Sequence, residues 1–311
     1  MKIFAVFVLF VFGAVGENLV ENYDRELSTI KLLFYPNINS IDNPIEISPL
    51  YNTGWKLVDS LANETKLMIH GWNAFSNHIS VNPVLHAYLK ANNSRVLAVD
   101  WRDASQLSYV VARRIITSIA GRICGQLRYF VKETQIDIAN LHVIGHSLGC
   151  HIATHIGRCF DGEIGRLTAL DAAGPFFTKF STDAYSRNDF LFVDSIHTSA
   201  GLAGEFEVRG HAAFFPNGGV APQPGCEASD LISFTACSHY RVSNYFAESI
   251  LLPTTFLAHQ CELSLIQLPT AHRNCHNGSN VVLMGEHIDH NTRGVFYLQT
   301  FSTFPFGKDE L

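Results

Sequence analysis

The stretch Leu141-His142-Val143-Ile144-Gly145-His146-Ser147-Leu148-Gly149 decides the fold of this chain. Its apolar start, its Gly-x-Ser-x-Gly motif and the Ala- and Ile-containing segment that follows predict a strand, a sharp turn and a helix. Such a turn strains the serine backbone, and the flanking glycines leave room for it. We therefore expect Ser147 to stand at the strand end as a nucleophile. An ordinary strand–helix turn is the alternative.

Two backbone amides are candidates for an oxyanion hole beside Ser147. Leu148 opens the predicted helix, whose first N–H groups are directed at the serine. Upstream, an apolar run ends in His70-Gly71-Trp72, where the glycine lets the following backbone turn its N–H inward. An ordinary strand exit is the alternative there. We expect the N–H groups of Trp72 and Leu148 to act together.

The composition is that of a globular protein with a large core. Of 311 residues, 47% are hydrophobic and 16% are charged, which excludes a disordered chain. The formal net charge of −6 gives no reason to expect nucleic acid as a partner, and no Lys/Arg cluster suggests strong attraction to anionic membranes. We find no internal repeat and no linker, so we expect a single domain.

The first sixteen residues have the pattern of a secretory signal. Lys2 precedes an apolar run that is too short to span a bilayer, and Ala14 and Gly16 are small residues at a plausible cleavage site. We expect a signal peptide over residues 1–16 and a mature domain over residues 17–311. A membrane anchor is the alternative.

The last four residues, Lys308-Asp309-Glu310-Leu311, match a retrieval signal that a receptor of the endoplasmic reticulum (ER) would read. The expected location is therefore the ER lumen, with export from the cell as the alternative. Entry into the secretory pathway makes the 7 cysteines candidates for disulfide bonds. It also makes Asn63, Asn92 and Asn277, which begin Asn-x-Ser/Thr sequences, candidate glycosylation sites.

Strand and helix patterns alternate along the chain. Their order implies an α/β fold with a mainly parallel sheet and a site at the carboxyl edge of the strands. Residues 17–54 read as strands and loops at a sheet edge, and residues 199–225 read as loops. The main strands are expected over residues 66–70, 95–101, 141–146, 164–171, 190–196 and 294–300, and the helices over residues 77–90, broken near Pro83, and 109–133.

A loop between Cys226 and Cys237 is a candidate lid. It encloses ten residues, 227–236, and carries the apolar side chains Leu231, Ile232 and Phe234. An apolar patch on a tethered loop beside a candidate site is typical of a lid or a lipid contact, and a packed surface loop is the alternative. We expect these three side chains to contact substrate or lipid.

Six motifs follow one another along residues 66–306. They are, in order, His70-Gly71-Trp72, Gly145-His146-Ser147-Leu148-Gly149, Leu170-Asp171-x-Ala-Gly-Pro, Val193-Asp194-Ser-Ile-His-Thr, Phe215-Pro216-Asn217-Gly218-Gly219 and Cys237-Ser238-His239. Through these motifs the chain resembles the pancreatic lipase family of α/β-hydrolases, and in particular the insect and venom phospholipase A1 branch.

The resemblance implies a Ser-Asp-His triad. Ser147 matches the family nucleophile, and His239 matches the base that follows the second lid cysteine. Asp171 and Asp194 both sit near strand ends. The general α/β-hydrolase pattern would suggest Asp194, whereas the family pattern places the acid after the sixth strand. We choose Asp171 and expect Asp194 to be structural.

The resemblance also implies two disulfide bonds, Cys226–Cys237 and Cys261–Cys275. Cys124, Cys150 and Cys159 remain, so at least one of them is unpaired or bridges another chain. We expect no metal and no cofactor. His151 and His155 lie four residues apart, but no third ligand has suitable spacing. Vertebrate members of the family resemble calcium binders before the seventh strand, where this chain has Asp189 but serine at position 186.

The substrate expectation rests on loop lengths. The lid has ten residues and the loop 199–209 has eleven, and in this family a short lid and a short loop are associated with phospholipase A1. The chain ends soon after the catalytic domain, so we expect no C-terminal β-sandwich. We predict release of the sn-1 fatty acid of a phospholipid at a lipid–water interface. A triacylglycerol or broad ester lipase with the same triad and an inactive lipase-fold binding or storage protein are the alternatives.

Overall fold

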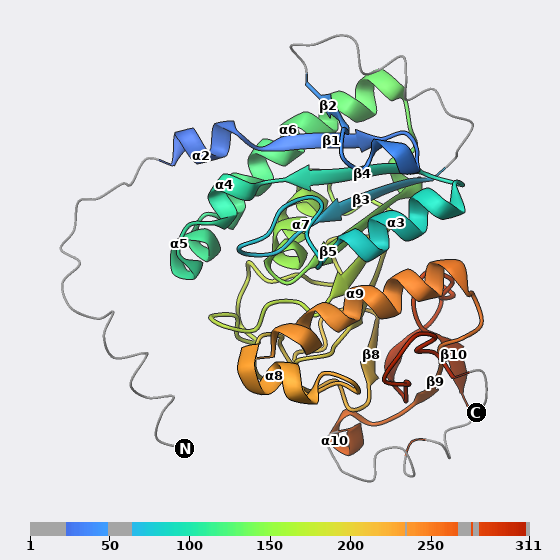
Figure 1. Ribbon diagram of the computed structural model, residues 1–311. Helices are drawn as coiled ribbons and strands as arrows, with labels where there is room; N and C mark the ends of the chain where they lie inside the picture. The colour runs from blue at the N-terminus through green and yellow to red at the C-terminus, as the bar shows by residue number, and fades with distance from the viewer. Residues whose placement is uncertain (1–22, 49–63, 234, 267–274, 276–279, 309–311) are drawn as a thin grey trace, which may run out of the picture.

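The structure is a computed structural model that describes residues 23–48, 64–233, 235–266, 275 and 280–308 (Figure 1). Several sequence predictions lie outside these residues. They are the signal peptide, Asn63, Phe234, Asn277 and the last three residues of the retrieval signal.

One sheet runs through the described part of the chain. Its eleven strands follow the order β10-β9-β11-β8-β7-β6-β5-β3-β4-β1-β2. The seven strands from β11 to β4 are parallel, and antiparallel strands extend both edges. The strands are β1 Lys31–Tyr35, β2 Ile45–Ile47, β3 Thr65–Ile69, β4 Arg95–Asp100, β5 Leu141–His146, β6 Arg166–Leu170, β7 Phe192–Ile196, β8 Ala212–Pro216, β9 Leu257–Gln260, β10 Val281–Leu283 and β11 Gly294–Leu298.

Helices cover both faces of this sheet (Figure 1). Helices α3 (Asn82–Ala91) and α9 (Ala236–Leu251) pack together on one face, and α6 (Ile116–Thr134) and α7 (Leu148–Cys159) pack together on the other. Burying a helical stripe against each face of the sheet yields a three-layer α/β-hydrolase fold with one apolar core on either side. The short helices are α2 Asp24–Ser28, η1 Ile38–Ser40, α4 Arg102–Ser105, α5 Tyr109–Arg114, η3 Ile138–Asn140, α8 Glu227–Ser233 and α10 Leu263–Ile266.

Most of the predicted elements are present, with shifted ends. The helix expected over 77–90 begins only at Asn82, because Pro83 suits the first helical turn, where its missing N–H needs no partner. The helix expected over 109–133 is two helices, because Ile115 leaves helical geometry with φ −97° and ψ 9°. The edge strands expected within 17–54 are β1 and β2.

The prediction of a loop over residues 199–225 was wrong in part, because strand β8 lies inside this range. All five residues of β8 are buried between neighbouring strands, so they show no apolar–polar alternation. The lid expected as a loop is also partly helical, since α8 occupies Glu227–Ser233.

Both expected disulfide bonds are formed, Cys226–Cys237 and Cys261–Cys275. A third links Cys124 on α6 to Cys159 at the end of α7, and Cys150 keeps a buried thiol. Three disulfide bonds fit a protein of the secretory pathway. None of the helices in the described ranges is both long and apolar enough to cross a membrane.

Candidate active site

Ser147 stands on the turn between β5 and α7. Its backbone has φ 55° and ψ −123°, a left-handed conformation that costs a non-glycine residue about 1–3 kcal/mol. Its N–H donates to the Leu170 carbonyl at 3.1 Å, which ties the turn to the end of the neighbouring strand β6. The strain is stored at the one residue whose hydroxyl the sequence predicts to be reactive.

The two motif glycines are required by close approach of the backbone. A Cβ on Gly145 would lie 2.7 Å from the amide nitrogen of Cys150, inside the turn itself. A Cβ on Gly149 would collide with the Ile69 carbonyl oxygen at the end of β3. The motif therefore lets α7 start directly against the sheet, so that Ser147 is held at its carboxyl edge.

Asp171 and His239 are brought together from distant parts of the chain. Asp171 follows β6 and is completely buried, and His239 lies in the first turn of α9. The Nδ1–H of His239 donates to Asp171 Oδ2 at 2.6 Å. This fixes the tautomer, so Nε2 is the nitrogen left free to act as a base. The predicted pairing of these two residues is thus present as geometry.

The Asp171 carboxylate also accepts three hydrogen bonds from the segment after β7. The backbone N–H groups of Thr198 and Ser199 donate to Oδ1 at 2.8 and 3.0 Å, and the Ser199 hydroxyl donates to Oδ2. Burial would raise the pKa of Asp171, but the hydrogen bond and charge of His239 and the donors on residues 198 and 199 outweigh it, so the pKa lies below the ordinary value. Sequence reasoning missed Ser199; its position just past a strand end at this edge was the available signal.

Asp194 has a different set of partners, although it is equally buried. It lies in the middle of β7, where Arg166 donates to its two oxygens at 2.8 and 3.1 Å and Thr168 donates at 2.9 Å. Both partners come from the neighbouring strand β6. Its carboxylate is therefore engaged inside the sheet, away from the strand ends where Ser147 lies.

The predicted oxyanion amides lie in two segments that pack against each other. A Cβ on Gly71 would be 2.7 Å from Ser147 Cβ, so the loop after β3 touches the serine. His70 accepts from the Trp101 N–H on Nε2 at 3.1 Å and so donates from Nδ1 to the Gly71 carbonyl at 2.9 Å. Because a trans peptide points its C=O and N–H in opposite directions, the Trp72 N–H faces away from His70. Leu148 opens α7, so its N–H has no intrahelical partner.

His146 contacts the candidate base, His239. Its Nε2–H donates to the backbone carbonyl of His239 at 2.9 Å, and the two rings lie 4.6 Å apart. Burial, together with the nearby charge of His239, lowers the pKa of His146 to about 3. His146 is therefore neutral and adds no positive charge beside the candidate base.

A pocket of about 310 Å³ opens over these residues. Ser147 and His239 lie in its wall, and most of the remaining wall is apolar or aromatic. Such a pocket suits an acyl chain better than a charged group. Its wall consists of Trp72, Ala74, Ser80, Tyr109, His146, Ser147, Ala173, Pro175, Ala203, Ala236, His239 and Tyr240. A larger groove of about 780 Å³ runs between α3 and α9, but neither Ser147, Asp171 nor His239 lines it.

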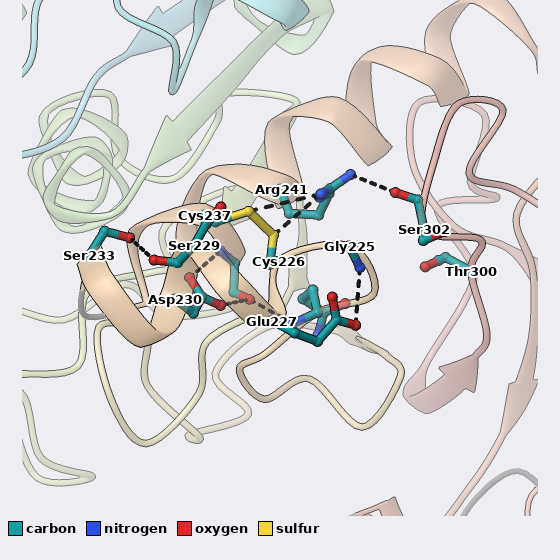
Figure 2. Close-up of a disulfide and its surroundings, with 12 residues drawn as sticks. Gly225, Cys226, Glu227, Ser229, Asp230, Ser233, Cys237, Arg241, Thr300 and Ser302 are labelled. Atoms are coloured by element: carbon teal, nitrogen blue, oxygen red, sulfur yellow. Dashed lines mark hydrogen bonds between the residues drawn. A yellow bond between two sulfur atoms is a disulfide. The ribbon is translucent and has the colours of Figure 1, made fainter.

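The lid helix α8 is tied to the helix that carries His239 (Figure 2). The Cys226–Cys237 disulfide bond joins the two ends of the segment that contains α8. Asp230 accepts hydrogen bonds from the backbone N–H of Ser238 at 3.1 Å and from the Ser238 hydroxyl. Leu231 and Ile232 are 88% and 87% exposed, so both predicted contact residues face solvent. The alternative, in which this segment packs its apolar side chains against the protein surface, does not hold for these two residues.

The remaining predicted positions have ordinary structural surroundings. His151 is buried, stacks on Phe177 with ring centroids 3.6 Å apart and bonds the Ala173 carbonyl at 2.9 Å. Asp189 pairs with Arg158 at 2.8 Å. Across the residues with described positions, no group of three or more His, Cys, Asp or Glu side chains could hold a metal ion. Asn92 is exposed at the end of α3, as a glycan acceptor requires.

Comparison with known proteins agrees with this geometry. A family model described as "Lipase" matches residues 17–306. Mouse pancreatic triacylglycerol lipase is 30% identical over 64% of this chain and 47% of its own length. Rat phospholipase A1 member A is 33% identical over 63% of this chain and 44% of its own, and the human protein of that name is 31% identical over 78% and 53%.

The chain thus spans about half the length of the curated relatives it matches. A putative α/β-superfamily hydrolase from Xanthomonas campestris is more distant, with 10% identity, a TM-score of 0.36 and coverage of 61% of this chain and 99% of that one. The extent of the family match and the order of the motifs lead to one conclusion. This chain belongs to the lipase family.

Proposed function

We propose that the protein is a serine carboxylic ester hydrolase that acts on lipids. The observation that carries this proposal is a strained Ser147 in the same apolar pocket as His239, whose Nδ1–H is held by buried Asp171. His239 takes the proton of Ser147 as the hydroxyl attacks the ester carbonyl, and the N–H groups of Trp72 and Leu148 stabilise the oxyanion. His239 then returns the proton to the leaving alcohol. Water hydrolyses the acyl-enzyme by the same steps.

Within this activity we propose phospholipase A1 specificity, with release of the sn-1 fatty acid. The cover over the pocket is small, since ten residues separate Cys226 from Cys237 and eleven separate Thr198 from Gly210. A small cover leaves the mouth of the pocket open to a bulky, charged headgroup. Two relatives named phospholipase A1 member A are among the matches, which also include pancreatic triacylglycerol lipases.

The test is fatty-acid release from phosphatidylcholine with different sn-1 and sn-2 chains, run beside triolein. We expect release of the sn-1 chain by the wild type and a loss of about a million-fold in kcat for Ser147→Ala. Release of fatty acid from triolein alone would be consistent with the triad, but it would reject the inference of phospholipase specificity from the short lid and the short loop. Full activity of Ser147→Ala on either lipid would reject the serine mechanism.

The second candidate is an inactive lipase-fold protein that binds or stores lipid. Ser147 lies in the same pocket as His239, and His239 is hydrogen-bonded to Asp171, which argues against it. A fluorophosphonate probe distinguishes the two, because it labels only an activated serine. Failure to label folded protein, together with no release from either lipid, would favour the binding protein.

The predicted retrieval to the ER through residues 308–311 remains a proposal of its own. Export of the wild-type protein from cells, with no change in its distribution when Leu311 is replaced by Ala, would reject it. Glycosylation at Asn63, Asn92 and Asn277 is likewise proposed from the sequence, and loss of one glycan per Asn→Gln change is the measurement.

A further inference from the structure

A row of three aromatic rings leads from the pocket to the protein surface. The Trp72 and Tyr109 rings are nearly perpendicular, with 5.6 Å between centroids, and Tyr109 stacks on Phe176 at 6.1 Å with 29° between the planes. Trp72 and Tyr109 line the pocket, whereas Phe176 lies on the loop after β6 and is 64% exposed. The apolar wall of the pocket therefore continues outward onto the surface of this loop.

The loop, residues 175–180, is firmly held by the rest of the protein. Phe177 is its buried anchor, with the Arg113 guanidinium 4.1 Å from its ring centroid on one side and His151 stacked on it. The backbone is tied at three further points by side chains of other elements. Tyr109 donates to the Pro175 carbonyl at 2.9 Å, Arg113 to that of Phe176 at 3.3 Å and Arg209 to that of Thr178 at 2.8 Å.

Two phenylalanines of this fixed loop nevertheless face solvent. Phe180 is 79% exposed, and Phe176 has φ 64°, a left-handed conformation that a bulky residue rarely adopts. Because the loop is held firmly, looseness does not explain why two of its rings are exposed. The fold maintains their exposure at the expense of backbone strain, which indicates that the exposed rings have a function.

The chemistry of the loop selects a lipid surface over other partners. Lys179 lies between the two rings in sequence, with its ammonium 4.9 Å from the Phe180 centroid. Aromatic rings with an adjacent lysine are typical of segments that insert to the level of lipid headgroups. The same apolar surface continues into a pocket whose proposed substrate lies in a lipid layer.

We propose that Phe176 and Phe180 insert into the lipid–water interface and dock the protein on a phospholipid surface. This inference rests on the proposed function for its choice of partner. Together with Leu231 and Ile232 on α8, the loop would give the protein two apolar contacts contributed by separate segments. Docking depends on apolar insertion, because the loop has a single cation and the chain carries a net charge of −6.

The experiment measures binding of the full-length Ser147→Ala protein to unilamellar phosphatidylcholine vesicles by flotation. This background removes hydrolysis, so binding and catalysis are scored separately. We expect Phe180→Ala to weaken partitioning about ten-fold and Phe176→Ala/Phe180→Ala about a hundred-fold. Leu191→Ala is the matched control. Leu191 is 58% exposed, but it lies at the amino-terminal end of β7, whereas the pocket lies at the carboxyl ends of the strands. This change should leave partitioning unchanged.

A second variant guards against misfolding as the cause of lost binding. Phe180→Trp places an indole in the loop, and we expect its emission to shift to the blue on vesicles and to be quenched by brominated phosphatidylcholine. Partitioning should change less than about two-fold on raising salt from about 0.1 to about 0.5 M, since few charges contribute.

Equal partitioning of the Phe variants and Leu191→Ala, or an emission spectrum of Phe180→Trp that does not shift on vesicles, would overturn the docking proposal. Neither result would touch the proposed activity. Conversely, vesicle binding through Phe180 by a protein whose wild type releases no fatty acid would retain the docking surface and reject the hydrolase.

Discussion

Asp171 lies just after β6 and Asp194 lies within the neighbouring strand β7, and the two carboxylates have different kinds of partner. Both are completely buried. Asp194 faces a permanent cation, Arg166, within the sheet, whereas Asp171 faces neutral N–H and O–H donors and the titratable ring of His239. The permanent positive charge of Arg166 neutralises the buried carboxylate of Asp194 at all times. Neutral donors stabilise the charge and leave it free to attract an imidazolium that forms during a reaction.

The largest expected effect comes from neutralising the first carboxylate. Asp171→Asn retains the shape but no longer stabilises the Nδ1–H tautomer of His239, so we expect kcat on a lipid or short-chain ester to fall about 10³- to 10⁴-fold. The measurement is single-substrate kinetics alongside a circular dichroism spectrum. An activity within ten-fold of wild type would show that Asp171 is not the acid of the triad.

Neutralising the second carboxylate should affect stability instead. Asp194→Asn leaves the buried Arg166 without its main anionic partner, and we expect the free energy of unfolding to fall by about 3 kcal/mol. Urea denaturation measures it, and kcat of the folded protein should stay within a few-fold of wild type. Glu46→Gln is the control, because its pair with Lys31 is exposed and contributes less than about 1 kcal/mol. A kcat loss as large as that of Asp171→Asn would contradict the structural role of Asp194.

A subtler change removes one donor from the Asp171 carboxylate. Ser199→Ala loses a hydrogen bond to a charged group, and we expect kcat/KM to fall about ten-fold while the fold is retained. Thr198→Val is the matched control, since the Thr198 backbone N–H bonds Asp171 but its buried hydroxyl has no partner among the described residues. Equal effects of the two changes would show that the Ser199 hydroxyl has no special role.

The smallest effect is a difference in pH dependence. In the folded protein the pKa of Asp171 lies below its ordinary value. Its ionised form therefore stabilises the fold above about pH 4, and this contribution is lost as the pH falls through the folded pKa. Between about pH 5 and 3, unfolding free energy should fall less steeply for Asp171→Asn than for wild type. Parallel curves would mean that Asp171 gains no net stabilisation from its partners.

Local patterns predicted the part of the site that local geometry controls. The elbow at Ser147 follows from its glycines, because the contacts that exclude a Cβ arise within the turn or against the adjacent strand. The choice between Asp171 and Asp194 could not be made from periodicity, since it depends on which donors the fold brings to each. Arg166 lies 28 residues before Asp194, and His239 lies 68 residues after Asp171.

Two of the missed elements, β8 and α9, were missed for a similar reason. β8 is buried within the sheet and so lacks alternation, and residues typical of turns surround it. Helix α9 begins within the lid disulfide, at Ala236, and several serines interrupt its apolar pattern. Its existence depends on packing against α3 more than on its own sequence. The strand ends, in contrast, were placed to within a few residues.

The bridge between Cys226 and Cys237 has a consequence for how such a chain can diversify. It holds the two ends of the lid 5.5 Å apart at Cα, and the helix that carries His239 continues from the second end (Figure 2). An insertion or deletion between the cysteines changes the cover without moving its endpoints. The length of the lid can therefore vary over generations while His239 keeps its position beside Asp171.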